Sequence, residues 1–212
     1  MTQPQRYFST IVAGLATIML AGCSVVGGKA AEETSYSVLE RDGDVELRQY
    51  DDYAIARTFV ASSYDEMGSE AFGRLFDYIS GDNTSGGDIA MTAPVLMAPT
   101  GDEIAMTAPV LTQAEGDGWW MAFVLPQGLD VASAPVPNDP RVEIIDIAGP
   151  RVASLSYSGL MDEETNTGNA ERLRAWIEQR ELQPSSGFQV AGYNPPWTIP
   201  FLRRNEILIE LN

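Results

Sequence analysis

The feature that most constrains the fold is an order of predicted elements that occurs twice along the chain. In each half, segments with the alternation of half-buried strands precede one amphipathic helix, and further strands follow that helix. A Pro-rich stretch over residues 126–139 separates the halves. Most connections are shorter than a parallel crossover needs, so we expect largely antiparallel pairing. The pattern predicts an α+β fold with two pseudo-symmetric halves and two helices packed outside a sheet or barrel.

The helix of the first half is expected from about Tyr64 to Ile79, with Ser62 or Ser63 as its N-cap, because apolar residues recur there at helical spacing. The helix of the second half is expected from about Asn169 to Glu181, capped by Asn166 or Thr167. The predicted strands are 36–41, 45–50, 53–60, 119–125, 141–147, 151–157, 188–193 and 206–211.

A near-identical pair of segments lies between the first helix and residue 112. Residues 88–96 and 103–111 share eight of nine positions at an offset of 15, which is too short for a solenoid repeat. We interpret them as neighbouring strands joined by a hairpin turn at 97–102. Each copy contains one Pro, which lacks a ladder donor, so each strand should sit at an edge or bend there. Both a local duplication without chemistry and a ligand-facing role remain open.

Charge and residue types exclude several functions. The chain has 13 basic and 30 acidic residues and a net charge of −17, which argues against nucleic acid and anionic membrane surfaces as electrostatic partners. It has no histidine, so the commonest metal ligand and general base are missing. No calcium-loop, nucleotide-loop, nucleophile-elbow or Cys-x-x-Cys spacing occurs. We therefore expect no catalytic residues and no metal site.

The N-terminal residues have the pattern of an export signal. Arg6 precedes an apolar run over 11–20 that is too short to span a bilayer stably, and Leu20-Ala21-Gly22-Cys23 follows. This ending resembles the bacterial lipobox, which implies that Cys23 is lipidated and becomes the first residue of the mature chain.

We therefore expect a signal peptide over 1–22, the lipidated Cys23 with a flexible tether over 23–35, and one folded domain over 36–212. The mature chain, with 12 basic and 30 acidic residues, carries a net charge of −18. Ser24 favours the outer membrane over the inner one, with the protein in the cell envelope and facing the periplasm.

Several motifs along the folded part occur in one order. They are Tyr36-x-Val-Leu-x-Arg41, Val45-Glu-Leu-Arg-Gln-Tyr50, Ile-Ala-Met-Thr-Ala-Pro-Val, Trp-x-x-x-Phe-Val-Leu-Pro, Asn194-Pro-Pro-Trp197 and Arg203-Arg-Asn-Glu206. Over about residues 36–212 the chain resembles the SOUL family of haem-binding proteins. The resemblance implies a distorted antiparallel β-barrel, built from two pseudo-symmetric β-α-β-β repeats with two flanking helices. It also implies non-enzymatic binding of haem or another tetrapyrrole in an apolar groove along the first helix.

Carried onto this chain, the resemblance gives a set of candidate contacts for haem or a porphyrin on the helix over 64–79. They are Met67, Phe72, Leu75, Phe76, Tyr78 and, for the carboxylates, Arg74. The same apolar stripe can also be ordinary core packing.

The haem carboxylates need a nearby cation on so acidic a protein, and Arg57, Arg74, Arg203 and Arg204 are candidates. Ligation of the iron by histidine is excluded, so it would fall to a Met or Tyr such as Met67, Met91, Met106 or Tyr78.

Two functions follow from these expectations. The first is an envelope-anchored, monomeric lipoprotein that binds a tetrapyrrole or another flat apolar ligand. The alternative is a structural or protein-interaction lipoprotein of the envelope that keeps the fold without binding haem. In both, the membrane is contacted through the lipid on Cys23, and nucleic acid is not a partner.

Overall fold

The computed structural model describes residues 32–84, 101–195 and 197–212. The predicted signal peptide, Cys23, most of the tether and the first copy of the repeated segment lie outside these ranges. Over the described ranges, no helix is long and apolar enough to cross a membrane.

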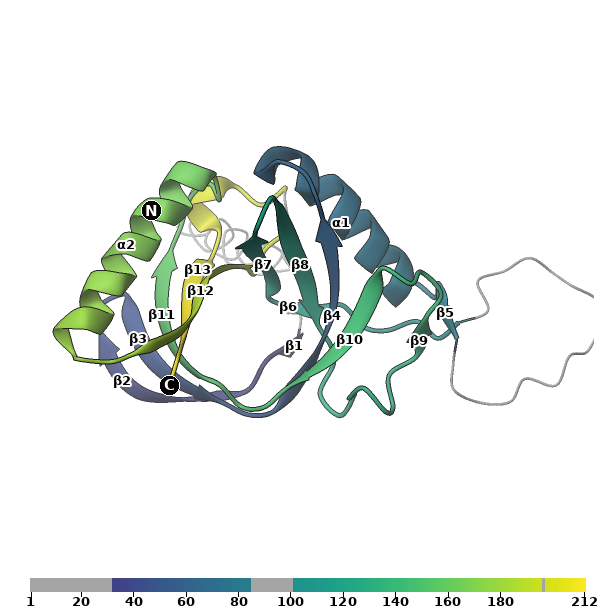
Figure 1. Cartoon of the computed structure of the whole chain (residues 1–212), viewed down its shortest axis with the longest axis horizontal. Coiled ribbons are helices and arrows are strands. Elements are labelled where there is room, and N and C mark those ends of the chain that lie inside the picture. The colour runs from purple at the N-terminus through teal and green to yellow at the C-terminus, as the bar shows by residue number, and fades with distance from the viewer. Residues whose placement is uncertain (1–31, 85–100, 196) are drawn as a thin grey trace, which may run out of the picture. The chain divides into compact units, whose positions relative to one another are not determined.

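A large antiparallel sheet dominates the described part of the chain (Figure 1). Its nine strands there are β2 (Tyr36–Asp42), β3 (Val45–Tyr50), β4 (Tyr53–Val60), β7 (Val110–Glu115), β8 (Gly118–Val124), β10 (Val142–Ile147), β11 (Arg151–Tyr157), β12 (Pro184–Gly192) and β13 (Asn205–Leu211). The helices are α1 (Tyr64–Ile79), α2 (Glu163–Gln179) and the short η1 (Pro200–Leu202). Two small pairings join β1 (Glu32–Glu33) to β6 (Thr107–Ala108) and β5 (Asn83–Thr84) to β9 (Val136–Pro137).

The two helices cover the convex face of the curved sheet, and its other face is concave (Figure 1). Beneath α1, buried Met67, Leu75 and Tyr78 pack against Met121 and Phe123 from β8 and other apolar residues. A second core lies beneath α2, and a third, rich in tyrosine, lies on the concave face. Both faces of the central strands are therefore buried, which explains why residues 119–125 are apolar on both sides.

The strand order shows an exchange between the two halves. The order is β10-β4-β8-β7-β12-β13-β11-β3-β2. Each repeat, β4-α1-β7-β8 and β11-α2-β12-β13, places its last strand between its other two. The strand that precedes each repeat pairs with the other repeat, since β3 lies beside β11 and β10 beside β4. Each half of the chain thus supplies an outer strand to the other half.

The predicted α+β class, the two helices and the antiparallel pairing are confirmed. The helix over 64–79 has the predicted bounds. The hydrogen-bonded ladder ends at β10 and β2 without joining them, so the closed barrel implied by the resemblance is not confirmed.

Two sequence expectations are wrong. Helix α2 begins at Glu163, because the Asp162 side chain caps it by accepting a hydrogen bond from the Thr165 backbone N–H at 2.8 Å. The second copy of the repeated segment, 103–111, was expected to pair in a hairpin with the first copy, 88–96, which lies outside the described residues. Instead, Val110 and Leu111 of the second copy pair with β8 on one side and β12 on the other, so both edges are occupied. Pro109 separates β6 from β7, in keeping with the expected bend.

A buried ion pair joins β3 to the C-terminal strand β13. The Arg48 side chain is 2% exposed and the Glu206 side chain 0% exposed. Two hydrogen bonds link them, from Arg48 Nη1 to Glu206 Oε2 at 2.7 Å and from Nη2 to Oε1 at 3.0 Å. The Tyr193 hydroxyl donates to Glu206 Oε2 at 2.8 Å. Such bidentate geometry and extra donors are what allow buried charges to be tolerated.

Replacing Arg48 with Met should lower the free energy of unfolding by about 3–5 kcal/mol, because Glu206 would keep a buried charge without its main partner. Urea unfolding followed by circular dichroism measures this. The double variant Arg48→Met/Glu206→Leu should be destabilised by less than the sum of the two single changes. If the double variant were destabilised by the full sum of the two single changes, the two side chains would not be energetically coupled.

The same pair predicts an acid-sensitive stability. Burial alone would raise the pKa of Glu206, but the hydrogen bonds and charge of Arg48 outweigh burial and lower it from 4.5 to about 2. Because the folded pKa lies below the unfolded one, the contribution of Glu206 is complete above pH 4.5 and is lost as the pH falls toward 2. Across that window the free energy of unfolding of the wild type should fall more steeply than that of Glu206→Gln. Equal slopes would show that Glu206 does not carry the effect.

Candidate functional site

A groove lies at the seam between the two helix-side cores. Its floor comes from β7, β8 and β12, one wall comes from α1, and Met161, just before α2, lies on the other side. The cavity volume is about 520 Å³, within the range of roughly 300–1,000 Å³ that is usual for small-molecule sites. Its lining residues are Tyr64, Met67, Gly68, Ser69, Phe72, Val110, Thr112, Met121, Met161, Val190, Gly192, Asn194, Arg203 and Asn205.

The local sequence of α1 explains the wall. Met67, Ala71, Leu75 and Tyr78 point into the core beneath the helix. The adjacent stripe Tyr64, Gly68 and Phe72 repeats every four residues and therefore faces the groove along one side of α1. Gly68 has no side chain, and a Cβ built there would meet nothing within 4 Å. A glycine thus keeps the middle of the wall open.

The groove lining combines apolar side chains with a smaller number of polar groups. Three thioethers, from Met67, Met121 and Met161, line it together with Val110 and Val190. Methionine side chains adapt their shape and make favourable contacts with aromatic rings. Asn194, Arg203 and Asn205 add polar groups. Such a lining can hold a flat apolar molecule that carries an anionic edge.

A polar cluster holds the two walls together. The Tyr64 hydroxyl of α1 donates to the Met161 carbonyl at 2.8 Å and accepts a hydrogen bond from Asn166 Nδ2 at 3.2 Å. The Tyr157 hydroxyl donates to Asn166 Oδ1 at 2.6 Å. Burial raises the pKa of Tyr157, so its phenol stays a donor at neutral pH. Asn166, expected as a helix cap, is instead buried in this cluster.

The sequence-predicted site residues separate into different environments. Met67 and Phe72 line the groove. Phe76 is exposed and stacks on Phe72 with ring centroids 6.0 Å apart. Leu75 and Tyr78 are fully buried core residues. The Tyr78 hydroxyl donates to the Pro135 carbonyl at 2.9 Å, and burial raises its pKa to about 12. Because only an ionised tyrosine is a good iron ligand, Tyr78 does not suit that role.

The four arginines considered as partners for the ligand's carboxylates also differ in their surroundings. Arg74 donates to Thr58 Oγ1 at 2.6 Å and to Glu70 Oε1 at 2.5 Å, and it does not line the groove. Arg57 pairs with Glu143 at 2.9 Å, and Arg204 pairs with Glu206 at 3.0 Å. Of the four arginines considered, Arg203 lines the groove, where its Nε donates to the Thr198 carbonyl at 2.8 Å.

The donor set of the groove fits the ring of a tetrapyrrole better than its metal. Its candidate donors to iron are thioethers and a hydrogen-bonded phenol, and thioethers are weak ligands for ferric iron. Met106 is exposed and lies outside the groove lining, and Met91 lies outside the described residues. Within the described ranges, no three Asp, Glu, Cys or His side chains gather as a metal site.

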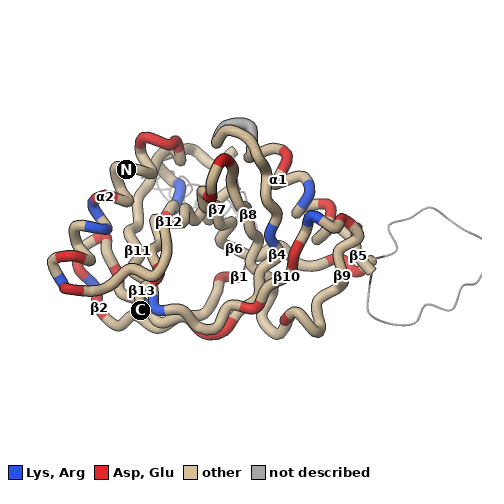
Figure 2. The backbone as a smooth tube through the Cα atoms, in the orientation of Figure 1, with Lys and Arg blue, Asp and Glu red and all other residues tan. Residues whose placement is uncertain are grey.

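A second cavity, of about 500 Å³, lies near the concave face. Its lining includes Arg57, Glu115, Gln189 and Glu210, and Arg57 stacks over the Trp120 ring at 4.0 Å. Acidic residues also outnumber basic ones along the described chain (Figure 2). The carboxylates of Glu115 and Glu210 would repel an anionic ligand, so the groove beside α1 is the better candidate.

Comparisons with known proteins agree with the motif order. The family described as SOUL heme-binding protein matches residues 31–210. Heme-binding protein 1 of Xenopus laevis is 27% identical over 187 residues, covering 87% of this chain and 93% of that protein. Heme-binding protein 1 of Mus musculus is 30% identical over 144 residues, covering 68% and 70%.

Similarity to solved structures concerns the fold alone. A crystal structure described as a hydrolase from Listeria innocua superposes with a TM-score of 0.51 at 9% identity, covering 82% of this chain and 94% of that one. At that identity the likeness does not transfer an activity.

Proposed function

This chain belongs to the SOUL heme-binding protein family, and from that premise we propose that its groove beside α1 binds haem or another tetrapyrrole without catalysis. The observation that carries the proposal is the groove itself, an apolar cavity of about 520 Å³ beside the helix that the family resemblance designates. Homologues named Heme-binding protein 1 support the same ligand class.

The ring would be held by apolar contact. Met67, Met121 and Met161 offer adaptable contacts to its faces, and Phe72 offers an aromatic one. Arg203, in the groove lining, would attract the ligand's carboxylates. When bound, haem would supply redox chemistry of its own, while these side chains bind and orient the ring and exclude water from it. Because the chain has no histidine, affinity would come from the ring and its carboxylates.

This binding mode predicts that iron is dispensable. Titration of residues 24–212 with haemin and with iron-free protoporphyrin IX should give dissociation constants that agree within about threefold, because neither ligand gains a histidine bond. Soret absorbance measures the first and porphyrin fluorescence the second. Haemin binding more than tenfold tighter than protoporphyrin would show that an iron ligand dominates. No saturable binding of either would favour the structural alternative.

The two glycines of α1 allow a matched test of the location. Gly68→Leu should weaken protoporphyrin binding at least about tenfold, because the new side chain fills the middle of the groove. Gly73 is in the same helix, and a Cβ there also meets nothing within 4 Å, but it does not line the groove. Gly73→Leu should bind as the wild type does. Both changes favour the helix by up to about 1 kcal/mol, so misfolding would not explain a loss. Unchanged binding by Gly68→Leu would place the ligand elsewhere.

We further propose that the domain is anchored in a bacterial envelope through a lipid on Cys23 and faces the periplasm, preferably at the outer membrane. The support is the sequence Leu20-Ala21-Gly22-Cys23 after a short apolar run. Eight residues separate Cys23 from Glu32, where β1 begins, so the lipid would lie close to the fold.

Expression of the full chain in a diderm bacterium with a clickable palmitate tests the anchor. The wild type should incorporate the label, fractionate with the outer membrane and have Cys23 at its mature N-terminus by mass spectrometry. Cys23→Ala should remain unlabelled, because it lacks the thiol at which lipid attachment begins. A mature N-terminus at any other residue would refute the lipoprotein assignment.

A further inference from the structure

Apolar side chains cluster on the connection between β12 and β13. Trp197 is 83% exposed, Phe201 72% and Leu202 63%, and Ile199 is also exposed. Leu160, from the connection between β11 and α2, is exposed as well. We call these five residues the apolar loop cluster. Single exposed apolar residues are ordinary, but a contiguous group usually marks a binding surface.

The loop is held in a defined shape. The Leu202 N–H donates to the Ile199 carbonyl at 2.9 Å, and the Gly159 N–H donates to the Pro200 carbonyl at 2.9 Å. The second bond places Leu160 next to the turn η1. Arg203 Nε donates to the Thr198 carbonyl at 2.8 Å. These bonds satisfy the backbone from within, so the apolar side chains remain exposed although the loop is structured.

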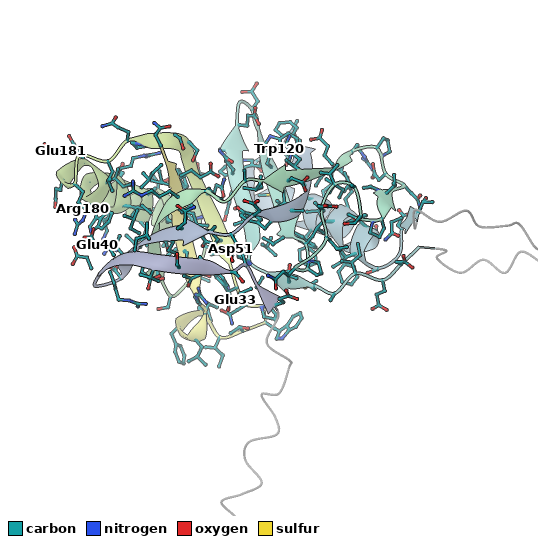
Figure 3. The ribbon with its side chains drawn as sticks, turned by 90° about the horizontal axis from the view of Figure 1, so that it is seen from below. Glu33, Glu40, Asp51, Trp120, Arg180 and Glu181 are labelled. Atoms are coloured by element: carbon teal, nitrogen blue, oxygen red, sulfur yellow. The ribbon has the colours of Figure 1, made fainter. Side chains whose placement is uncertain are left out.

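The cluster lies on the side from which the tether leaves the fold. Arg204, two residues after Leu202, forms an ion pair with Glu33 of β1 at 2.8 Å. In Figure 3, Glu33 and the η1 turn both lie at the lower side of the domain. The chain toward Cys23 therefore begins beside the cluster.

The length of that tether limits where the domain can sit. Nine peptide units join Cys23 to Glu32, which span at most about 30 Å when fully extended. A domain of this size measures roughly 40 Å across. A lipid on Cys23 would thus keep the cluster near the bilayer and could not present the opposite side to it.

We propose that the apolar loop cluster inserts into the interfacial layer of the phospholipid bilayer that holds the Cys23 lipid. The location rests on the anchor proposed above. The run 197–202 contains no charged residue. Exposed tryptophan with other large apolar residues is a composition that favours the membrane interface. Insertion gives the tethered domain one fixed orientation.

The net charge of −18 sets the lipid preference. Carboxylates elsewhere on the domain are repelled by anionic headgroups, so insertion depends on apolar contact and favours zwitterionic lipid. A bilayer fits this surface better than an acidic or basic protein partner, because the cluster itself offers no charge to pair.

The test uses the single cysteine of the chain. Residues 23–212 are coupled through Cys23 to a maleimide lipid in phosphatidylcholine vesicles, with and without brominated acyl chains. This coupling replaces the natural lipid, so the result does not depend on whether cells lipidate Cys23. Trp197 should be quenched by the brominated chains, and Trp197→Phe should lose most of the quenching. The other three tryptophans are half-buried or buried within the fold.

Two double variants complete the test. Phe201→Ser/Leu202→Ser should reduce the quenching at least about threefold, because it removes the apolar area that enters the bilayer. Val131→Ser/Val136→Ser changes two valines that are also exposed, at 51% and 61%, but lie outside the cluster, and it should quench as the wild type does. An unquenched wild type, or equal quenching of both double variants, overturns the proposal. A concentration-dependent blue shift without quenching would show association between protein copies and would overturn it too.

Discussion

The contact between Arg48 and Glu206 is the constraint on which the arrangement of this domain depends. It joins strands that are 158 residues apart in the sequence and that lie on either side of β11. Together with the β3–β11 ladder, it holds the outer strand β3 in the half that contains α2, although the chain continues directly into the half that contains α1. Because β10 makes the reverse exchange, neither half is a complete unit without the other. The two halves meet where β7 pairs with β12, and the groove lies along that seam.

The sequence was sufficient to predict α1, since the recurrence of Met67, Ala71, Leu75 and Tyr78 defines one buried face. It could not separate core residues from groove residues within the predicted set. Leu75 is fully buried, whereas Phe72, three positions earlier, borders a cavity whose floor includes residues of β7 and β12. Met121 and Met161 come from distant segments, and no local pattern singles them out. The glycines of the helix, Gly68 and Gly73, were the available signal for an open wall, but only the structure shows that Gly68 alone of the two lines the groove.

The errors at α2 and at the repeated segment have one physical origin. Asn166 and Asp162 are both good helix caps by residue type, and the choice between them was made by tertiary contacts. Asn166 is buried and bonded to Tyr64 and Tyr157, which leaves Asp162 to accept the Thr165 N–H. Likewise, the repeated segment looks self-complementary, yet Val110 and Leu111 find partners in β8 and β12. Local similarity indicates strands but does not choose their neighbours.

The connection between β12 and β13 links the groove to the exposed surface. Asn194 and Arg203, at its two ends, both line the groove, while Trp197 and Phe201 between them face away from the core. The Asn194 side chain accepts a hydrogen bond from the Arg204 N–H at 2.6 Å, which closes the base of the loop. Any contact made by the exposed side chains therefore acts on residues that are fixed relative to Arg203. If the exposed side chains enter a bilayer as proposed, Arg203 and the groove lining around it would lie near the boundary between lipid and water, which an apolar ligand with carboxylates itself prefers.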